Sequence, residues 1–501
     1  MPGRPPLCLA LSALLALLAI AAARPATDWA GDRRVDSQVR RLLRPRGQHS
    51  VSIRLLPGGE EIYALNAAAP RRLASVSKLF TVATALARLG PDYRFRTGFY
   101  ADGLVGPSAG NLYLKGFGDP FLVSEEWRIV VGALPLMEVR GDVVVDDSYF
   151  EPDLALVEEP GVPNPYNAIN AAFATNFNTL HVVVEDGHVR GEEQTPLTPF
   201  TVFDLRSTRR GPLSIETQQT ERELWVKIRG RLGARPRSLR FNLGRDPRTP
   251  ALYAGHLFAA FFARGGGTPI AGTVRRGSVP ESADLLYLHR SSLTLAEVAS
   301  ELLDYSNNFI ANQVFLVLGA EVSGAPANVQ KSRVLLAGDV KERVGSDAVR
   351  LFDGSGLDPR NVGAAAAITT YLTVIHDEQP LLHTLLRSYL DGRVRAKSGT
   401  YTQEGVRAMA GYLIDAGGEP YASFALLCDG RKCDRRTPEK YDQLLAQLSD
   451  LVPPPIATSA PATGPAVEPA ESLLPLEPPM PPAAPYDGGY CVPPEDAGGA
   501  G

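Results

Sequence analysis

Residues 75–90 read SVSKLFTVATALARLG, and this stretch predicts a helix that begins beside a reactive pair of side chains. Apolar residues recur at helical spacing up to Leu89, and Gly90 follows as a stop signal. Ser75 and Lys78 stand three positions apart, so they share one face of the first turn. A neutral amine beside a hydroxyl can take the hydroxyl proton, which is how a serine becomes a nucleophile.

Two further polar clusters follow this SxxK pattern along the chain. Residues 306–308 read SNN near a predicted helix boundary, and residues 397–399 read KSG where a predicted strand begins. Only 8 residues of the chain are Lys. A K[ST]G triplet is therefore expected by chance roughly 0.1 times in a chain of this composition. The three patterns in this order are a specific signal, although each is weak alone.

Each cluster also has a purely structural explanation. Ser75 could be a helix N-cap, Lys78 a solvated helix residue, and residues 306–308 a polar turn between two helices. Each explanation suffices for one cluster taken alone. The joint occurrence of the clusters favours one catalytic site over three unrelated structural features.

The remaining sequence alternates between strand-like and helical segments. Residues 51–66 predict two strands joined by a turn at 57–59, and residues 93–280 predict mostly short strands. Helical periodicity predicts further helices at 251–264, 295–318, 364–375, 381–390 and 438–451. Two adjacent strands are expected at 406–414 and 421–427.

The chain resembles the D-alanyl-D-alanine carboxypeptidase/endopeptidase family of the penicillin-binding protein 4 type, over about residues 30–450. Besides the three motifs, the supporting stretches are LYLKGFGDP at 112–120, DDSYF at 146–150, DGSGL at 353–357, RAKSGT at 395–400 and AGY at 410–412. Ser398 replaces the commoner Thr of the family but keeps the hydroxyl. The resemblance implies an α+β fold with a penicillin-binding transpeptidase-like antiparallel sheet flanked by helices and interrupted by a large strand-rich insertion.

The resemblance also implies an activity. The expected enzyme is a serine-type D-Ala-D-Ala carboxypeptidase or endopeptidase that hydrolyses peptidoglycan stem peptides or cross-links through an acyl-enzyme and is inhibited by penicillin. The expected catalytic residues are Ser75, Lys78, Ser306, Asn308 and Lys397, and the expected substrate-binding residues are Ser398, Gly399 and Thr400. No cofactor and no metal are implied.

The chemistry gives each of these residues a role. Lys78 would be the base, with its pKa lowered by burial and by Lys397 as a second cation. Ser306 would relay a proton, and Asn308 would hold the Lys78 ammonium or a substrate amide. In the family arrangement the backbone N–H groups of Ser75 and Thr400 form the oxyanion hole.

The spacing of the motifs predicts a divided catalytic domain. Ser75 and Ser306 are far more distant in sequence than a compact β-lactamase needs. We therefore expect strand-rich inserted modules at 96–284, between catalytic segments at 28–95 and 285–452. The insertion is expected to overhang the cleft and to help select large substrates.

The two ends of the chain have distinct compositions. Residues 1–23 combine Arg4, an apolar run and an Ala-rich end, which predicts a cleaved signal peptide; the alternative is an uncleaved anchor. The chain is therefore expected to be exported to the periplasm or cell envelope. Residues 453–501 hold 14 of the 42 Pro and no Lys or Arg, which predicts a disordered acidic tail.

Composition narrows the possible partners. The formal net charge is −4, so no basic field exists to hold nucleic acid, and no transmembrane span is expected in the mature chain. Seven His without HExxH and four Cys without CxxC argue against zinc. Cys428 and Cys433 could close a small disulfide loop, which the spacing leaves open. The expected partners are peptidoglycan peptides, with β-lactams as covalent inhibitors.

Two rival functions remain at this stage. One is a related serine esterase or β-lactamase, and the other is a non-enzymatic cell-wall-binding protein on the same scaffold. The EPDL stretch at 151–154 echoes a β-lactamase loop, but it precedes the SxN triplet instead of following it. Stable acylation by penicillin, and not efficient hydrolysis of it, is therefore expected.

Overall fold

The computed structural model describes residues 31–44, 46–154, 156, 164–165, 168–192, 195–232, 235–401, 404–433 and 435–451. The predicted signal peptide at 1–23 and the predicted tail at 453–501 lie outside the described residues. No helix among the described residues combines the length and the apolarity that a membrane crossing requires.

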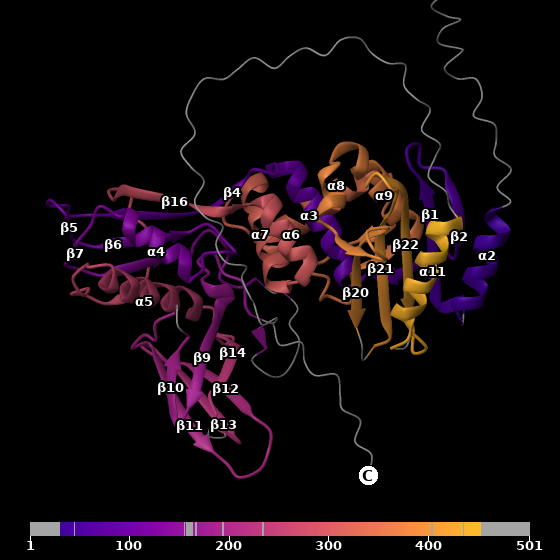
Figure 1. Cartoon of the computed structure of the whole chain (residues 1–501). Coiled ribbons are helices and arrows are strands. Elements are labelled where there is room, and N and C mark those ends of the chain that lie inside the picture. The colour runs from indigo at the N-terminus through magenta and orange to yellow at the C-terminus, as the bar shows by residue number, and fades with distance from the viewer. Residues whose placement is uncertain are drawn as a thin grey trace, which may run out of the picture. The chain divides into compact units, whose positions relative to one another are not determined.

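The central layer is a six-stranded antiparallel sheet with the order β19-β20-β21-β22-β1-β2 (Figure 1). Its strands are β1 (His49–Leu55), β2 (Glu61–Leu65), β19 (Arg387–Tyr389), β20 (Val394–Tyr401), β21 (Val406–Ile414) and β22 (Pro420–Asp429). Strands β21 and β22 are buried almost throughout, so both of their faces carry apolar side chains. The sheet therefore needs helices on both sides.

Two helical layers cover this sheet. Helices α2 (Gly31–Leu42) and α11 (Thr437–Leu451) share one apolar cluster with β1, β20, β21 and β22. On the other face, the helices that share an apolar cluster with the sheet are α3 (Ser77–Leu89), α6 (Leu295–Tyr305), α7 (Asn308–Ser323), α8 (Val329–Val344), α9 (Ala365–Glu378) and the short α10 (Leu381–Leu385). A small sheet of β3 (Pro70–Arg72), β17 (Val349–Arg350) and β18 (Val362–Ala364) lies just before the turn that leads into α3. This layered α+β architecture confirms the expected fold class.

Between α3 and α6 the chain builds a second apolar core. Its main sheet has the order β15-β8-β6-β4-β16, formed by β4 (Arg94–Ala101), β6 (Leu112–Gly116), β8 (Val143–Asp146), β15 (Val274–Arg276) and β16 (Asp284–Thr294). Helices α4 (Ser124–Ala133) and α5 (Thr249–Arg264) pack on it, and β5 (Ser108–Ala109) and β7 (Glu138–Val139) pair at its margin. The expected domain boundaries stay a prediction.

Two three-stranded sheets complete this region. One has the order β10-β9-β14, with β9 (Thr179–Glu185), β10 (His188–Gly191) and β14 (Arg237–Asn242). The other has the order β11-β13-β12, with β11 (Thr201–Ser207), β12 (Ser214–Gln219) and β13 (Leu224–Gly230). Figure 1 shows both sheets near the N-terminal end of α5.

The helix predicted at 381–390 is wrong in its second half. Helix α10 ends at Leu385, and residues 387–389 instead form the edge strand β19, which pairs with β20. Leu390 and Asp391 then adopt positive φ angles of 52° and 55°, which turns the chain into β20. Pairing with a neighbouring strand outweighs the helical spacing of the leucines here.

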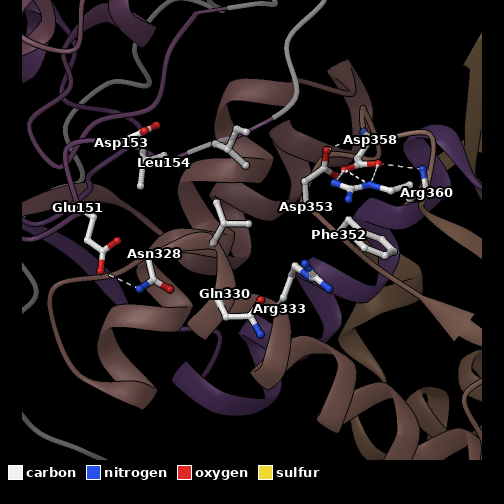
Figure 2. A pocket seen from close by; sticks show the side chains of 12 residues that line it. Glu151, Asp153, Leu154, Asn328, Gln330, Arg333, Phe352, Asp353, Asp358 and Arg360 are labelled. Carbon is white, nitrogen blue, oxygen red and sulfur yellow. Dashed lines mark hydrogen bonds and ion pairs between the residues drawn. The ribbon is translucent and has the colours of Figure 1, made fainter.

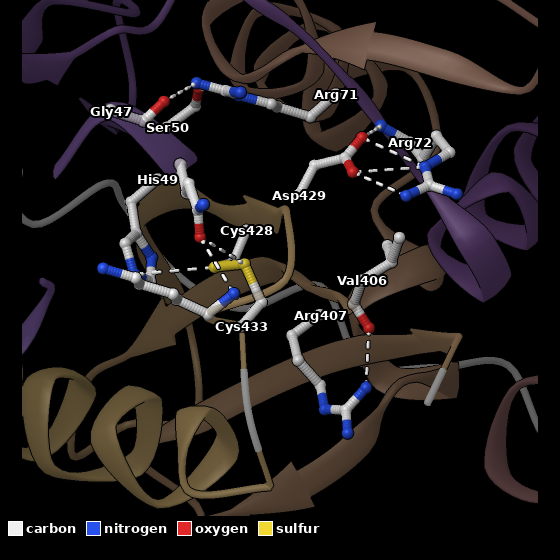
Figure 3. Close-up of a disulfide and its surroundings, with 12 residues drawn as sticks. Gly47, His49, Ser50, Arg71, Arg72, Val406, Arg407, Cys428, Asp429 and Cys433 are labelled. Carbon is white, nitrogen blue, oxygen red and sulfur yellow. Dashed lines mark hydrogen bonds and ion pairs between the residues drawn. A yellow bond between two sulfur atoms is a disulfide. The ribbon is translucent and has the colours of Figure 1, made fainter. Parts of the chain in front are cut away.

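The structure closes the Cys428–Cys433 pair as a disulfide at the end of β22, with 5.8 Å between the Cα atoms (Figure 3). Both cysteines are buried in the cluster beneath α2 and α11. The closed loop is short, so replacing both residues by Ser should lower the free energy of unfolding by only about 2 kcal/mol. Chemical denaturation of the double variant would measure this value, and penicillin acylation should be retained.

Candidate active site

Ser75 lies in a single 3₁₀ turn, η2 (Ala74–Val76), that leads directly into α3. Ala74 before it has a φ of +45°, a conformation that costs free energy in a residue with a Cβ atom. Backbone strain of this kind persists only where the surrounding structure enforces it, and it is found more often at functional sites. The Ser75 side chain is half-buried at the start of a buried helix.

Lys78 is fully buried, and its ammonium nitrogen has three oxygen partners. Nζ lies 2.9 Å from Ser75 Oγ, 2.7 Å from Asn308 Oδ1 and 2.6 Å from the backbone O of Ser355. Three segments that are distant in sequence thus meet at one amine. The structure brings Ser75, Lys78 and Asn308 together as the sequence predicted.

The three partners of Lys78 differ in whether they can donate a hydrogen bond. The Asn308 amide oxygen and the Ser355 carbonyl oxygen can only accept hydrogen bonds, whereas the Ser75 hydroxyl can accept or donate. A neutral Lys78 amine has two N–H bonds, and the two acceptor-only oxygens take both of them. The remaining lone pair then faces the Ser75 hydroxyl, so the geometry suits removal of its proton.

Electrostatics favours this neutral amine. Burial holds the pKa of Lys78 well below its usual range, and the nearby positive charge of Lys397 lowers that pKa further. The carboxylate of Asp353 acts in the opposite sense and raises it. Removal of water and repulsion by Lys397 are the larger effects, so Lys78 can be a base near neutral pH.

Ser306 occupies the junction between α6 and α7. Its backbone is left-handed, with φ 56° and ψ 34°, and the next residue, Asn307, caps α7 by accepting a hydrogen bond from Ile310 N at 3.1 Å. This sharp junction brings Asn308 onto Lys78. The Ser306 hydroxyl is half-buried and forms no hydrogen bond with any of the described residues, so the structure leaves its proposed relay role unassigned.

Strand β20 carries the KSG triplet along the opposite side of Ser75. Lys397 and Gly399 point to its buried face, whereas the side chains of Ser398 and Thr400 are exposed. Lys397 Nζ donates a hydrogen bond to Ser398 O at 3.1 Å. Burial, assisted by the charge of Arg387 and opposed by that of Asp304, lowers the pKa of Lys397 to about 8.

Gly399 is required by a close approach of two backbones. A Cβ atom at this position would lie 2.6 Å from Leu73 O, 2.9 Å from Ser75 N and 3.1 Å from Val76 N. Only a residue without a side chain lets β20 lie this near the turn that holds Ser75. The glycine of the KSG triplet therefore sets the distance between β20 and the serine backbone.

The DGSGL stretch at 353–357 contributes a part of the site for which the sequence motifs predicted no role. Asp353 is buried and accepts hydrogen bonds from the backbone N–H groups of Ser355 (3.1 Å), Gly356 (2.6 Å) and Asp358 (2.8 Å). Thr81 of α3 donates to Gly354 O at 2.8 Å. These bonds fix the loop so that Ser355 O reaches Lys78. Closely spaced Asp, Gly and Ser are a turn signal, but a turn signal does not reveal which side chain its carbonyl meets.

A cavity of about 400 Å³ lies beyond this loop (Figure 2). Asp353 lines it, but neither Ser75 nor Lys78 does. Figure 2 shows Phe352 beside the guanidinium groups of Arg333 and Arg360, which lie 4.3 Å and 4.4 Å from its ring centroid. The cavity therefore borders the Asp353 loop and does not include the nucleophile or its base.

The two lysines predict a bell-shaped pH profile. Lys397 is expected to hold the terminal carboxylate of a substrate peptide. The kcat/KM for a peptide with a free terminal carboxylate should then rise as Lys78 loses its proton and fall above pH about 8 as Lys397 loses its charge. A peptide with a terminal amide in place of the carboxylate should lack the alkaline decline, because it does not need the Lys397 charge. Equal alkaline declines for both peptides would contradict a carboxylate-binding role of Lys397.

Among the described residues, no group of three or more His, Cys, Asp or Glu side chains could hold a metal ion. The arrangement around Ser75 consists of a hydroxyl, two amines, an amide and backbone groups. These groups can activate the Ser75 hydroxyl for acyl transfer by accepting its proton.

Comparison with known proteins gives a consistent result. A family model described as D-Ala-D-Ala carboxypeptidase 3 (S13) matches residues 35–451. A D-alanyl-D-alanine carboxypeptidase of Actinomadura sp. (strain R39) is 27% identical over 420 residues, which is 74% of this chain and 76% of the relative. Penicillin binding protein 4 (dacB) of Haemophilus influenzae is 20% identical with a TM-score of 0.65, covering 83% of this chain and 99% of that one. The same Haemophilus protein has also been solved in complex with a β-lactam.

Proposed function

Because the chain belongs to the D-Ala-D-Ala carboxypeptidase 3 (S13) family of serine-type peptidases, we propose that Ser75 is the nucleophile with which it hydrolyses peptidoglycan peptides. The observation that carries this proposal is the 2.9 Å contact between Lys78 Nζ and Ser75 Oγ, made by an amine whose other two partners only accept. A hydroxyl poised against such an amine has a base for its proton.

The reaction begins when Ser75 Oγ attacks the carbonyl carbon of the penultimate D-Ala. Lys78 takes the hydroxyl proton, and the backbone N–H groups of Ser75 and Thr400 stabilise the oxyanion, each such donor typically contributing a factor of about 10² to 10³. The C–N bond then breaks, and the amine of the terminal D-Ala leaves with a proton that Ser306 relays from Lys78. Water, deprotonated by the same lysine, hydrolyses the ester and regenerates Ser75.

Substrate recognition falls to strand β20. The ammonium of Lys397 and the hydroxyls of Ser398 and Thr400 bind the carboxylate of the terminal D-Ala. Both hydroxyls are exposed to solvent, whereas the Lys397 amine is buried and has little water to screen its charge. Cleavage of a cross-link is the same chemistry with a larger amine as leaving group.

The same serine would be acylated by β-lactams, because their strained amide resembles the D-Ala–D-Ala bond. The complex of the Haemophilus relative with a β-lactam supports this extension. We also propose that the chain is exported and acts in the periplasm or cell envelope, where its substrate lies. The expected inserted modules at 96–284 would then face the polymeric wall.

Penicillin labelling followed by peptide mass spectrometry tests the proposal. The penicilloyl adduct should map to the peptide that contains Ser75, with one adduct per chain. The Ser75→Ala variant should acquire no adduct, while Ser77→Ala, two positions away at the start of α3, should still be labelled. An adduct on any other serine, or none on folded protein, would refute the assignment of Ser75.

A further inference from the structure

One segment of the second core has a charge opposite to that of the whole chain. Residues 201–240 contain ten Arg and Lys but only four Asp and Glu, which gives this segment a net charge of +6 in a chain of −4. The segment covers the sheet β11-β13-β12 and continues into β14. Such a local excess of one sign attracts partners of the opposite sign.

The sheet β11-β13-β12 has one apolar and one polar face. Leu224, Val226 and Ile228 of β13 are buried in the second core. The residues between them therefore point to the other face, because side chains alternate along a strand. These residues are Trp225, which is 37% exposed, with Lys227 and Arg229.

The strand register extends this outer face to both neighbours. On β11, Val202, Asp204 and Arg206 pair with Trp225, Lys227 and Arg229, and on β12 the corresponding partners are Gln218, Glu216 and Ser214. The face thus has a tryptophan at one end and cations along the centre. Its acids are Asp204, which pairs with Arg206 at 3.4 Å, Glu216, and Glu223 beside Trp225.

The cations of this segment are largely available for a partner. Among its described residues, Arg206 is the one cation that forms an ion pair with a carboxylate. Further exposed arginines are Arg209, Arg210, Arg222, Arg231, Arg235 and Arg237. Leaving so many guanidinium groups unpaired at a surface has no structural benefit for a small sheet.

Trp225 gives the face a second property. Its ring is partly exposed on the outer face of the sheet, and its indole N–H donates to Glu223 Oε2 at 3.2 Å, which fixes the ring edge. An oriented tryptophan followed by Lys227 and Arg229 on the same face of β13 has the composition of a binding hot spot. Flat aromatic rings can stack on the apolar faces of sugar rings.

We propose that this face, defined here as the β13 platform (Trp225, Lys227 and Arg229 with the exposed arginines of 206–237), binds polymeric peptidoglycan. The inference rests on the proposed function. Peptidoglycan combines glycan strands with peptides, and each peptide that the enzyme trims ends in a carboxylate. The tryptophan and the cations of the platform match these two components, so the platform holds the enzyme on the polymer.

The experiment measures binding to insoluble peptidoglycan sacculi with the full chain carrying Ser75→Ala, so that no turnover occurs. Adding Trp225→Ala, or Arg209→Gln with Arg210→Gln, should weaken binding by about tenfold at low salt. The weakening by the arginine changes should shrink as salt is raised, because salt screens exposed charges. Arg128→Gln with Arg264→Gln removes the same charge from the exposed faces of α4 and α5 and should leave binding unchanged.

Activity measurements on the platform variants test this inference independently of the proposed function. With Ser75 intact, the platform variants should hydrolyse a soluble D-Ala–D-Ala peptide and react with penicillin at the wild-type rate, yet trim sacculi more slowly. Unchanged binding in both platform variants would overturn the inference while leaving Ser75 unaffected. Equally tight, Trp225-dependent binding to anionic phospholipid vesicles or to DNA would also overturn it. Failure of Ser75 to be acylated would instead refute the proposed function, with the binding result intact.

Discussion

Lys78→Met should slow the acylation of Ser75 by penicillin by about 10²- to 10⁴-fold, the range that a positioned general base contributes. Methionine fills nearly the same volume, so the loss isolates the amine from the packing of α3. The variant leaves the Asn308 amide oxygen and the Ser355 carbonyl without their donor. Leaving such buried acceptors unpaired costs about 1–3 kcal/mol each, an amount that a domain of this size tolerates.

The measurement is a stopped-flow or quench series that separates the affinity for penicillin from the rate of acylation. The rate should fall while the affinity changes little, because Lys78 acts on the serine proton and not on the ligand. Lys115→Met is the matched control, since this lysine pairs with Asp146 at 3.0 Å outside the site. A Lys78→Met protein that acylates at the wild-type rate would show that another group is the base.

Gly399→Ala should lower the same acylation rate by about 10²-fold, because a displacement of about 1 Å at a reacting centre can cost that much. The added methyl group would lie 2.6 Å from Leu73 O and 2.9 Å from Ser75 N, both of which are backbone atoms. Neither can rotate away as a side chain would. Strand β20 must therefore move off the serine turn, and the Thr400 N–H moves with it.

Thermal unfolding distinguishes this effect from a general loss of structure. Gly338→Ala, on the exposed side of α8, meets no atom within 4 Å and should leave the acylation rate unchanged, while the melting temperature rises slightly because alanine is favoured over glycine in a helix by about 1 kcal/mol. Gly399→Ala should lose acylation at temperatures where it is still fully folded. Wild-type acylation by folded Gly399→Ala would mean that the approach of β20 to Ser75 is not needed for catalysis.

The elements that the sequence predicted well are those whose pattern is local. The hairpin of β1 and β2 and the helix that follows Ser75 were both predicted from residues within one window. Helix α8 was not predicted, because its buried residues include Ser332 and Asp339 beside Leu336 and Val340. Asp339 is buried there because it pairs with Arg343 and Arg88. Polar residues that are buried for their partners remove the apolar periodicity on which such a prediction depends.

The features of the active site also fall into two groups, those that the sequence determines and those that the tertiary structure decides. The sequence alone determines that a hydroxyl and an amine stand three positions apart. It also determines the SNN and KSG triplets. The contact of the amine with Asn308, 230 positions away, was expected from the motifs, whereas its contact with the carbonyl of Ser355, 277 positions away, follows only from the folded chain. The lowered pKa of Lys78 was also expected, but its physical cause exists only in the folded chain. This pKa is set by the exclusion of water and by the charge of Lys397, and both arise when distant segments pack together.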